Sequence, residues 1–80
     1  MLKNKCSLNQ AALDFILSYE NKISSGEEVI ISELVKLFRK SAYYEIKFDT
    51  YVKPPNGAIW YGLKRSGNWT RVKPGIYRKL

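Results

Sequence analysis

Residues 54–78 read PPNGAIWYGLKRSGNWTRVKPGIYR, and this stretch decides the fold that the sequence predicts. Its second half has the form of a β-hairpin. Residues 69–73 alternate along a short run, Pro74-Gly75 is a pair typical of turns, and residues 76–79 return. We therefore expect two antiparallel strands that carry several basic side chains.

The two faces of this hairpin do not separate cleanly in the sequence. Trp69, with Val72 or Ile76, can pack inward, but strict alternation places Arg71 and Lys73 on the same face as Trp69. Charged side chains avoid a core. We therefore expect a twisted, mostly solvent-exposed hairpin whose first strand is anchored at one end only.

The first half of the stretch, residues 58–66, predicts a helix. Ile59 and Leu63 are four residues apart and would face the core together. A strand remains the alternative, because Ile, Trp and Tyr favour strands and Gly62 costs about 1 kcal/mol in a helix interior. In the helix, the side chains that point outward are Tyr61, Lys64 and Arg65.

The N-terminal part of the chain predicts a helix over residues 8–21. Ser7 followed by Gln10 three residues later is the pattern of a capping box. Gly26 is a plausible left-handed residue in the turn that follows. One helical stripe holds the apolar side chains Leu8, Ala12, Phe15, Ile16, Tyr19 and Ile23.

Between these two regions the sequence predicts a brief strand at residues 27–31 and a second helix over residues 33–40, with Ser32 as its N-cap. The connection that follows is ambiguous. A helical continuation through residues 42–44 is one reading. A strand is the other, since polar residues alternate with Tyr44, Ile46 and Phe48. Pro54-Pro55-Asn56-Gly57 ends either element, and Asn56 is a candidate cap for the next helix.

Composition indicates one small basic domain, residues 1–80, with a net charge of +7. The charge is uneven. Residues 1–40 hold six Lys and Arg against five acids, whereas residues 41–80 hold eight against two. Such asymmetry is typical of a surface that faces a polyanion. Cys6 is alone, no apolar run is long enough for a membrane span, and no signal peptide is evident, so we expect a cytoplasmic protein.

Catalytic chemistry finds little support in the sequence. There is no histidine, and one cysteine cannot build a structural zinc site, so we expect no metal and no cofactor. Glu45-x-Lys47 with Asp49 imitates half of a restriction nuclease site, but such a site needs another acid on a neighbouring strand to hold Mg²⁺. A solvated strand face is the simpler interpretation. The sequence therefore predicts a protein that is not an enzyme.

The predicted order of helix, strand, helix, helix and hairpin is that of a winged helix-turn-helix, an α+β fold of about three helices with a C-terminal hairpin wing. Two short motifs, LKRSG at residues 63–67 and GIYRKL at residues 75–80, resemble the N-terminal domain of Mrr-type restriction endonucleases and the HARE helix-turn-helix domain. The segment IISEL at residues 30–34 is similar to the usual entry into their second helix. The long aromatic connection between the second and third helices departs from that pattern.

This resemblance implies binding to double-stranded DNA, with the third helix near a major groove and the wing on the backbone or the minor groove. Arginine can bind guanine through two hydrogen bonds, and lysine neutralises phosphate. The candidate DNA-binding residues are Tyr61, Lys64, Arg65, Arg71, Lys73, Arg78, Lys53 and Lys47. A role in regulation or in a mobile-element or restriction context would fit.

Two other functions fit the same residues. The first is an interaction module, such as a phage-type inhibitor, that docks a basic aromatic face on an acidic protein partner. The second is a binder of single-stranded nucleic acid or RNA on an antiparallel sheet built from residues 43–53, 58–65, 69–73 and 76–79, which requires residues 58–65 to form a strand. Trp60, Tyr61 and Trp69 could stack on bases in such a binder. In so small a chain, however, we expect Trp60 and Trp69 to lie in the core, whereas Tyr61 suits the core and the surface equally.

Overall fold

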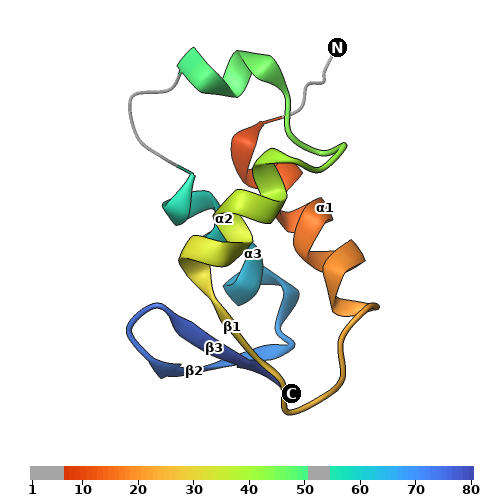
Figure 1. The fold of residues 1–80 in the computed structure, drawn as a ribbon, viewed down its shortest axis with the longest axis vertical. Helices are drawn as coiled ribbons and strands as arrows, with labels where there is room; N and C mark the ends of the chain where they lie inside the picture. The colour runs from red at the N-terminus through yellow and green to blue at the C-terminus, as the bar shows by residue number, and fades with distance from the viewer. Residues whose placement is uncertain (1–6, 51–54) are drawn as a thin grey trace.

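The computed structural model describes residues 7–50 and 55–80, which form an α+β fold (Figure 1). Three α-helices and a three-stranded antiparallel sheet make up this part of the chain, in an order compatible with a winged-helix layout. The predicted α+β class is therefore confirmed. The elements are α1 (Leu8–Glu20), β1 (Glu28–Ile30), α2 (Ile31–Arg39), a 3-10 helix (Ile46–Thr50), α3 (Asn56–Ser66), β2 (Trp69–Lys73) and β3 (Ile76–Lys79).

The sheet has the order β1-β3-β2, so the last strand lies in the middle and pairs antiparallel with both others. Val29 of β1 lies opposite Tyr77 of β3. Hydrogen bonds extend this pairing beyond β1, because the Gly26 amide donates to the Lys79 carbonyl at 2.7 Å. The predicted hairpin and the brief first strand are both present, and β3 joins them into one sheet.

Helix α1 begins where the sequence indicates. The Ser7 hydroxyl accepts a hydrogen bond from the Gln10 amide at 3.1 Å, which confirms Ser7 as the N-cap. The Gln10 side chain donates to Asp14 one turn later instead of returning to Ser7. Gly26 has a φ of 93°, in the left-handed region that the turn before β1 requires.

The predicted N-cap at Ser32 is wrong, because α2 follows β1 without an intervening turn and starts at Ile31. Ile30 occupies the cap position, and its side chain makes no capping hydrogen bond. The Ile31 amide donates instead to the Gly75 carbonyl, at 2.8 Å, in the hairpin turn. One of the unpaired amides at the start of a helix thus finds its acceptor in a distant segment.

The connection from α2 to α3 contains no strand in its described part, so the strand reading of its alternating pattern is wrong. Ile46–Thr50 form a 3-10 helix, in which Phe48 is buried and Ile46 is exposed. The Tyr44 ring lies between Phe38 and Phe48, edge-on to both at 5.2 and 5.4 Å between ring centroids. Packing of aromatic rings onto the helical core, and not pairing with a sheet edge, fixes this segment.

A hydrogen bond closes the same connection. The Tyr44 hydroxyl donates to an Asp49 carboxylate oxygen at 2.7 Å. That bond, with partial burial, raises the pKa of the Tyr44 phenol above its ordinary value. Because the pKa is raised, the contact stabilises the fold at neutral pH, and this contribution is lost only as an alkaline pH passes the raised pKa.

Helix α3 spans Asn56–Ser66, which confirms the helical reading of residues 58–66 and excludes the sheet that a strand there would have built. Asn56 does not cap it, because Pro55 holds the cap position and no side chain bonds to the first turn. The helix ends at Gly67, whose φ of 77° is left-handed. Its buried stripe consists of Ala58, Ile59, Gly62 and Leu63.

The contact between α1 and α3 explains the glycine that local propensity disfavours. A Cβ atom placed on Gly62 would lie 3.1 Å from Cγ1 of Ile16 and 3.2 Å from the carbonyl oxygen of Ala12. Glycine and alanine at facing positions thus let the two helix backbones approach closely. The cost of glycine in a helix interior is offset by the core that this approach closes.

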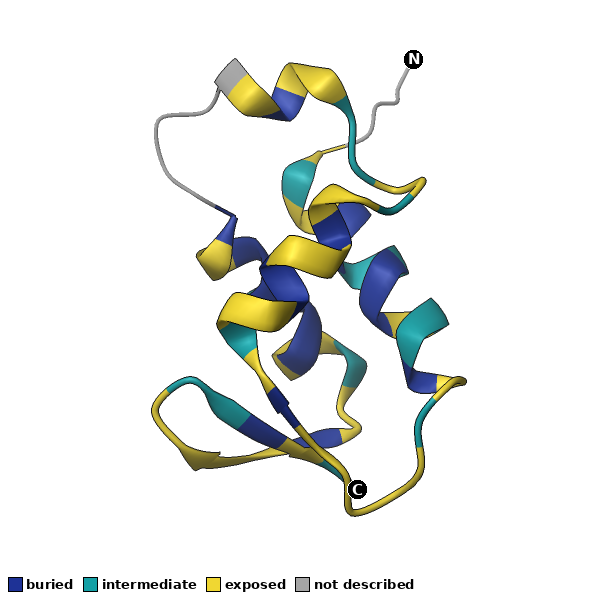
Figure 2. Ribbon diagram, in the orientation of Figure 1, coloured by how far each residue is buried: buried dark blue, intermediate teal, exposed yellow. Residues whose placement is uncertain are grey.

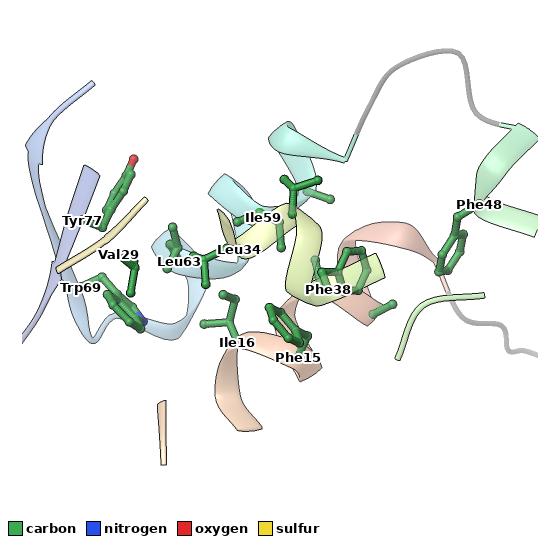
Figure 3. Packing of buried hydrophobic residues seen from close by; sticks show 14 residues of the cluster. Phe15, Ile16, Val29, Leu34, Phe38, Phe48, Ile59, Leu63, Trp69 and Tyr77 are labelled. Carbon is green, nitrogen blue, oxygen red and sulfur yellow. The ribbon is translucent and has the colours of Figure 1, made fainter. Parts of the chain in front are cut away.

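The core runs as one row from the sheet to the 3-10 helix (Figures 2 and 3). Val29, Trp69 and Tyr77 lie at the sheet end, and Phe48 lies at the opposite end (Figure 3). The middle of the row holds its fully buried side chains, Ile16, Leu34, Phe38, Ile59 and Leu63. The three helices therefore cover one face of the sheet, and the other face of the hairpin is left to solvent.

A buried carboxylate fastens the hairpin to α1. Glu20, the last residue of α1, is only 8% exposed. Its two oxygens accept hydrogen bonds from the Trp69 indole nitrogen at 2.7 Å and from the Asn68 side-chain amide at 3.1 Å. Both carboxylate oxygens of Glu20 thus have a hydrogen-bond donor. Burying this charge without such partners would be costly. This interaction fixes the entry of β2 relative to α1.

We expect Gly62→Val to destabilise the fold by about 1–3 kcal/mol, because the added methyl groups overpack the contact with Ala12. Gly57→Val is the matched control in the same helix, since nothing lies within 4 Å of a Cβ atom at that position. It should change the free energy of unfolding by less than about 0.5 kcal/mol. Urea unfolding followed by circular dichroism measures both, and equal effects would contradict the close approach.

Glu20→Gln should lower the free energy of unfolding by about 1.5–3 kcal/mol, because the charge and one of the two acceptor oxygens that Trp69 and Asn68 use are lost. Glu33→Gln, on an exposed residue of α2, should change it by less than about 0.5 kcal/mol. A double-mutant cycle of Glu20→Gln with Trp69→Phe should show a coupling of about 0.5–3 kcal/mol. Simple additivity of the two losses would mean that the bond is not energetically significant.

Candidate nucleic-acid interface

The outward face of α3 holds the first group of predicted site residues. Its buried stripe turns toward α1 and α2, which leaves the positions between stripe residues on the surface. Lys64 and Arg65 are exposed and Tyr61 is half-buried, as the helical reading predicts. Gly57 and Trp60 complete this surface, so two rings and two cations project from consecutive turns of one helix.

Trp60 lies on the surface, and its predicted place in the core is wrong. Its side chain is 46% exposed, because residue 60 falls beside the stripe formed by Ile59 and Leu63. The Lys64 ammonium lies 4.8 Å from the centre of the indole ring, within the range of a cation–π contact. The cation one turn further along α3 thus holds the ring in place. The sequence signal for this contact was the spacing of four residues, because side chains at positions 60 and 64 of a helix lie next to each other.

An open hollow of about 320 Å³ lies over this part of α3, lined by Trp60, Tyr61, Lys64 and Arg65. These four side chains combine apolar ring surface with two positive charges and a phenol. An arrangement of this kind suits a ligand that carries both negative charge and flat or apolar groups. Nucleic acid has that combination in its phosphates and bases.

The hairpin holds the second group. Arg71 and Lys73 are both exposed, and the register of β2 against β3 shifts between them. Val72 is the extra residue of this bulge, which turns the end of β2 away from the face of Trp69. The bulge resolves the conflict in the alternating pattern for Lys73, which lies opposite Ile76. Arg71 lies opposite Tyr77, stays on the face of Trp69 and is nevertheless exposed, because only the Trp69 end of β2 is buried. The expectation of a strand anchored at one end is confirmed.

Arg78 lies on β3 opposite Glu28 of β1, and its guanidinium contacts the Glu28 carboxylate at 3.0 Å. Sequence reasoning missed this partner, because the pairing of β1 with β3 joins residues fifty positions apart. The Glu27-Glu28 pair in a predicted strand was the available signal. Arg78 is therefore already matched with an acid, unlike Arg71 and Lys73, which form no salt bridge with any described residue.

Of the remaining predicted site residues, Lys47 is not brought to this surface. Lys47 lies in the 3-10 helix, where its ammonium is 3.5 Å from Glu45 and 5.9 Å from the Phe48 ring. Lys53 lies outside the described residues. Four of the predicted cations therefore remain as candidates for ligand contact: Lys64 and Arg65 on α3, and Arg71 and Lys73 on the hairpin.

The charge around these four cations is unbalanced. From Thr50 to the last residue, Leu80, the sequence contains seven Lys and Arg and no acid. Two acids from elsewhere in the chain that reach this part of the fold are already bonded: Glu20 to Trp69 and Asn68, and Glu28 to Arg78. The local field is therefore positive.

The nuclease-like trio of Glu45, Lys47 and Asp49 does not assemble a site. Asp49 accepts the hydrogen bond from Tyr44, and Lys47 pairs with Glu45. Residues 7–50 and 55–80 contain no cluster of three or more His, Cys, Asp or Glu side chains with the geometry to hold a metal ion. In the same residues, no helix has the length and apolar character to cross a membrane.

Comparison of the chain with protein-family models, with curated proteins and with solved structures found no significant match.

Replacing both Lys64 and Arg65 by Ala should lower the free energy of unfolding by less than about 1 kcal/mol, since both side chains are exposed and only the contact with Trp60 is lost. Leu63→Ala, one position earlier, should cost about 2–5 kcal/mol, because Leu63 is fully buried. Urea unfolding compares the two variants. The reverse order of the two losses would show that α3 presents its other face to the core.

Proposed function

We propose that this chain is a winged-helix domain that binds double-stranded DNA without catalysing a reaction on it. The observation that carries the proposal is the outward face of α3, where Trp60, Tyr61, Lys64 and Arg65 project together immediately before a basic hairpin. The order of elements, compatible with a winged helix, supports the same reading. The resemblance of residues 63–67 and 75–80 to winged-helix domains of restriction systems agrees with it.

In the proposed complex α3 lies in the major groove, which is wide enough to admit a helix. Arg65 has a fork of N–H groups that suits the guanine edge or a phosphate, and Lys64 supplies a single positive charge. Arg71 and Lys73 on the hairpin neutralise phosphates of the neighbouring backbone. Most of the affinity would then come from charge, and the protein would bind many sequences at low salt.

An acidic protein partner is the rival function, because the same hollow offers apolar rings between cations. Salt dependence alone does not separate the two, since both complexes would weaken as salt rises. The distinguishing result is indifference to DNA together with recovery of a defined acidic partner by affinity capture. The absence of acids from Thr50 onward favours the polyanion with the more uniform charge, which is DNA.

We expect fluorescence anisotropy with a mixed-sequence duplex to show binding whose logarithmic affinity falls with the logarithm of salt at a slope of about −4, from roughly four phosphate contacts. Replacing both Lys64 and Arg65 by Ala should reduce the magnitude of that slope by about 2. Lys22→Ala with Lys40→Ala removes the same charge from exposed positions outside α3 and the hairpin, and should leave the slope nearly unchanged.

The proposal fails if the wild-type protein shows no binding below about 100 μM at 50 mM salt, a condition that favours non-specific contacts. It also fails if the two double variants reduce the slope equally, because the effect would then report net charge and not the surface of α3.

A further inference from the structure

The exposed indole of Trp60 is not explained by phosphate binding. The other large apolar residues of α3, Ile59 and Leu63, are fully buried, whereas Trp60 is 46% exposed beside two cations. Tryptophan is enriched among the residues that carry most of the binding energy at interfaces. The contact at 4.8 Å from the Lys64 ammonium holds the ring before any ligand arrives. The ring is thus placed to make an apolar contact with the partner.

The shape of α3 would allow Trp60 to reach the floor of a groove in the partner. Gly57 lies one turn before Trp60 on the exposed side, and the space around it is open. The first turn of the helix is therefore slim, and Trp60 is the first bulky outward side chain. A helix with this profile can approach the floor of a groove until the indole meets the base edges.

The apolar group that duplex DNA presents at those edges is the C5-methyl group of thymine, which projects into the major groove. We infer that Trp60 packs against a thymine methyl group, and that the domain therefore binds thymine-containing duplexes more tightly than the same duplexes with uracil. This inference rests on the proposed binding of double-stranded DNA. It adds a base preference to a surface whose other contacts are electrostatic.

Stacking of Trp60 on a base is the less suitable arrangement. One face of the indole is in contact with the Lys64 ammonium, so the ring cannot insert between two bases without losing that contact. Bases in a duplex are also stacked on each other, and unstacking one costs a few kcal/mol. The methyl group needs neither change, since it is already exposed in the groove.

The test compares two short duplexes, one of alternating adenine and thymine and one in which uracil replaces every thymine. Both are checked to be double-stranded at the assay temperature. The wild-type protein should bind the thymine duplex about fourfold more tightly for each methyl group that the indole covers. Trp60→Ala should bind both duplexes equally, with a circular dichroism spectrum unchanged from the wild type.

Arg65→Ala is the matched control from the same face, and it should weaken binding to both duplexes while keeping their ratio. Equal binding of the two duplexes by the wild-type protein overturns the inference but leaves duplex binding intact. A thymine preference that persists in Trp60→Ala, or tighter binding to a single strand of thymine alone, which cannot pair with itself, also overturns it. Failure to bind any duplex removes the proposed function as well, so the two failures are distinct.

Discussion

The close contact between α1 and α3 is the constraint on which the rest of the structure depends. At this contact the backbone of Ala12 lies so near Gly62 that a side chain at residue 62 would press against it. Because the helices meet here, Ile59 and Leu63 turn inward, and the opposite face of α3 must turn outward. The outward position of Trp60, Tyr61, Lys64 and Arg65 follows from this one approach.

The hairpin depends on α1 in a second way. The carboxylate of Glu20 holds the indole of Trp69 and the amide of Asn68, two residues that come directly after the turn ending α3. The hairpin turn in exchange supplies the Gly75 carbonyl for the first amide of α2. Within β2 itself only Trp69 is buried, and Arg71 and Lys73 are exposed. A rigid base and an exposed basic end suit a surface that must contact an extended polyanion.

Several sequence predictions failed because a distant segment supplied what the local pattern lacked. Ser32 has the chemistry of a helix cap, but the Gly75 carbonyl satisfies the first amide of α2 and the helix starts one residue earlier. Tyr44, Ile46 and Phe48 alternate like a strand, but edge-on packing of Tyr44 against Phe38 and Phe48 favours a helical turn. Arg78 was predicted to contact DNA, but the pairing of β1 with β3 places Glu28 opposite it, and the two side chains form a salt bridge.

The sequence by itself determined the elements whose signals are local. These are α1 with its Ser7 cap, the hairpin with its Pro74-Gly75 turn, and the outward direction of Lys64 and Arg65 once residues 58–66 are helical. Only the tertiary structure decided that residues 58–66 are helical. The propensities of Ile, Trp, Tyr and Gly oppose a helix there, and the packing of Gly62 against Ala12 outweighs them. The tertiary structure also put Trp60 on the surface, because the stripe that α1 and α2 bury passes beside it and does not include it.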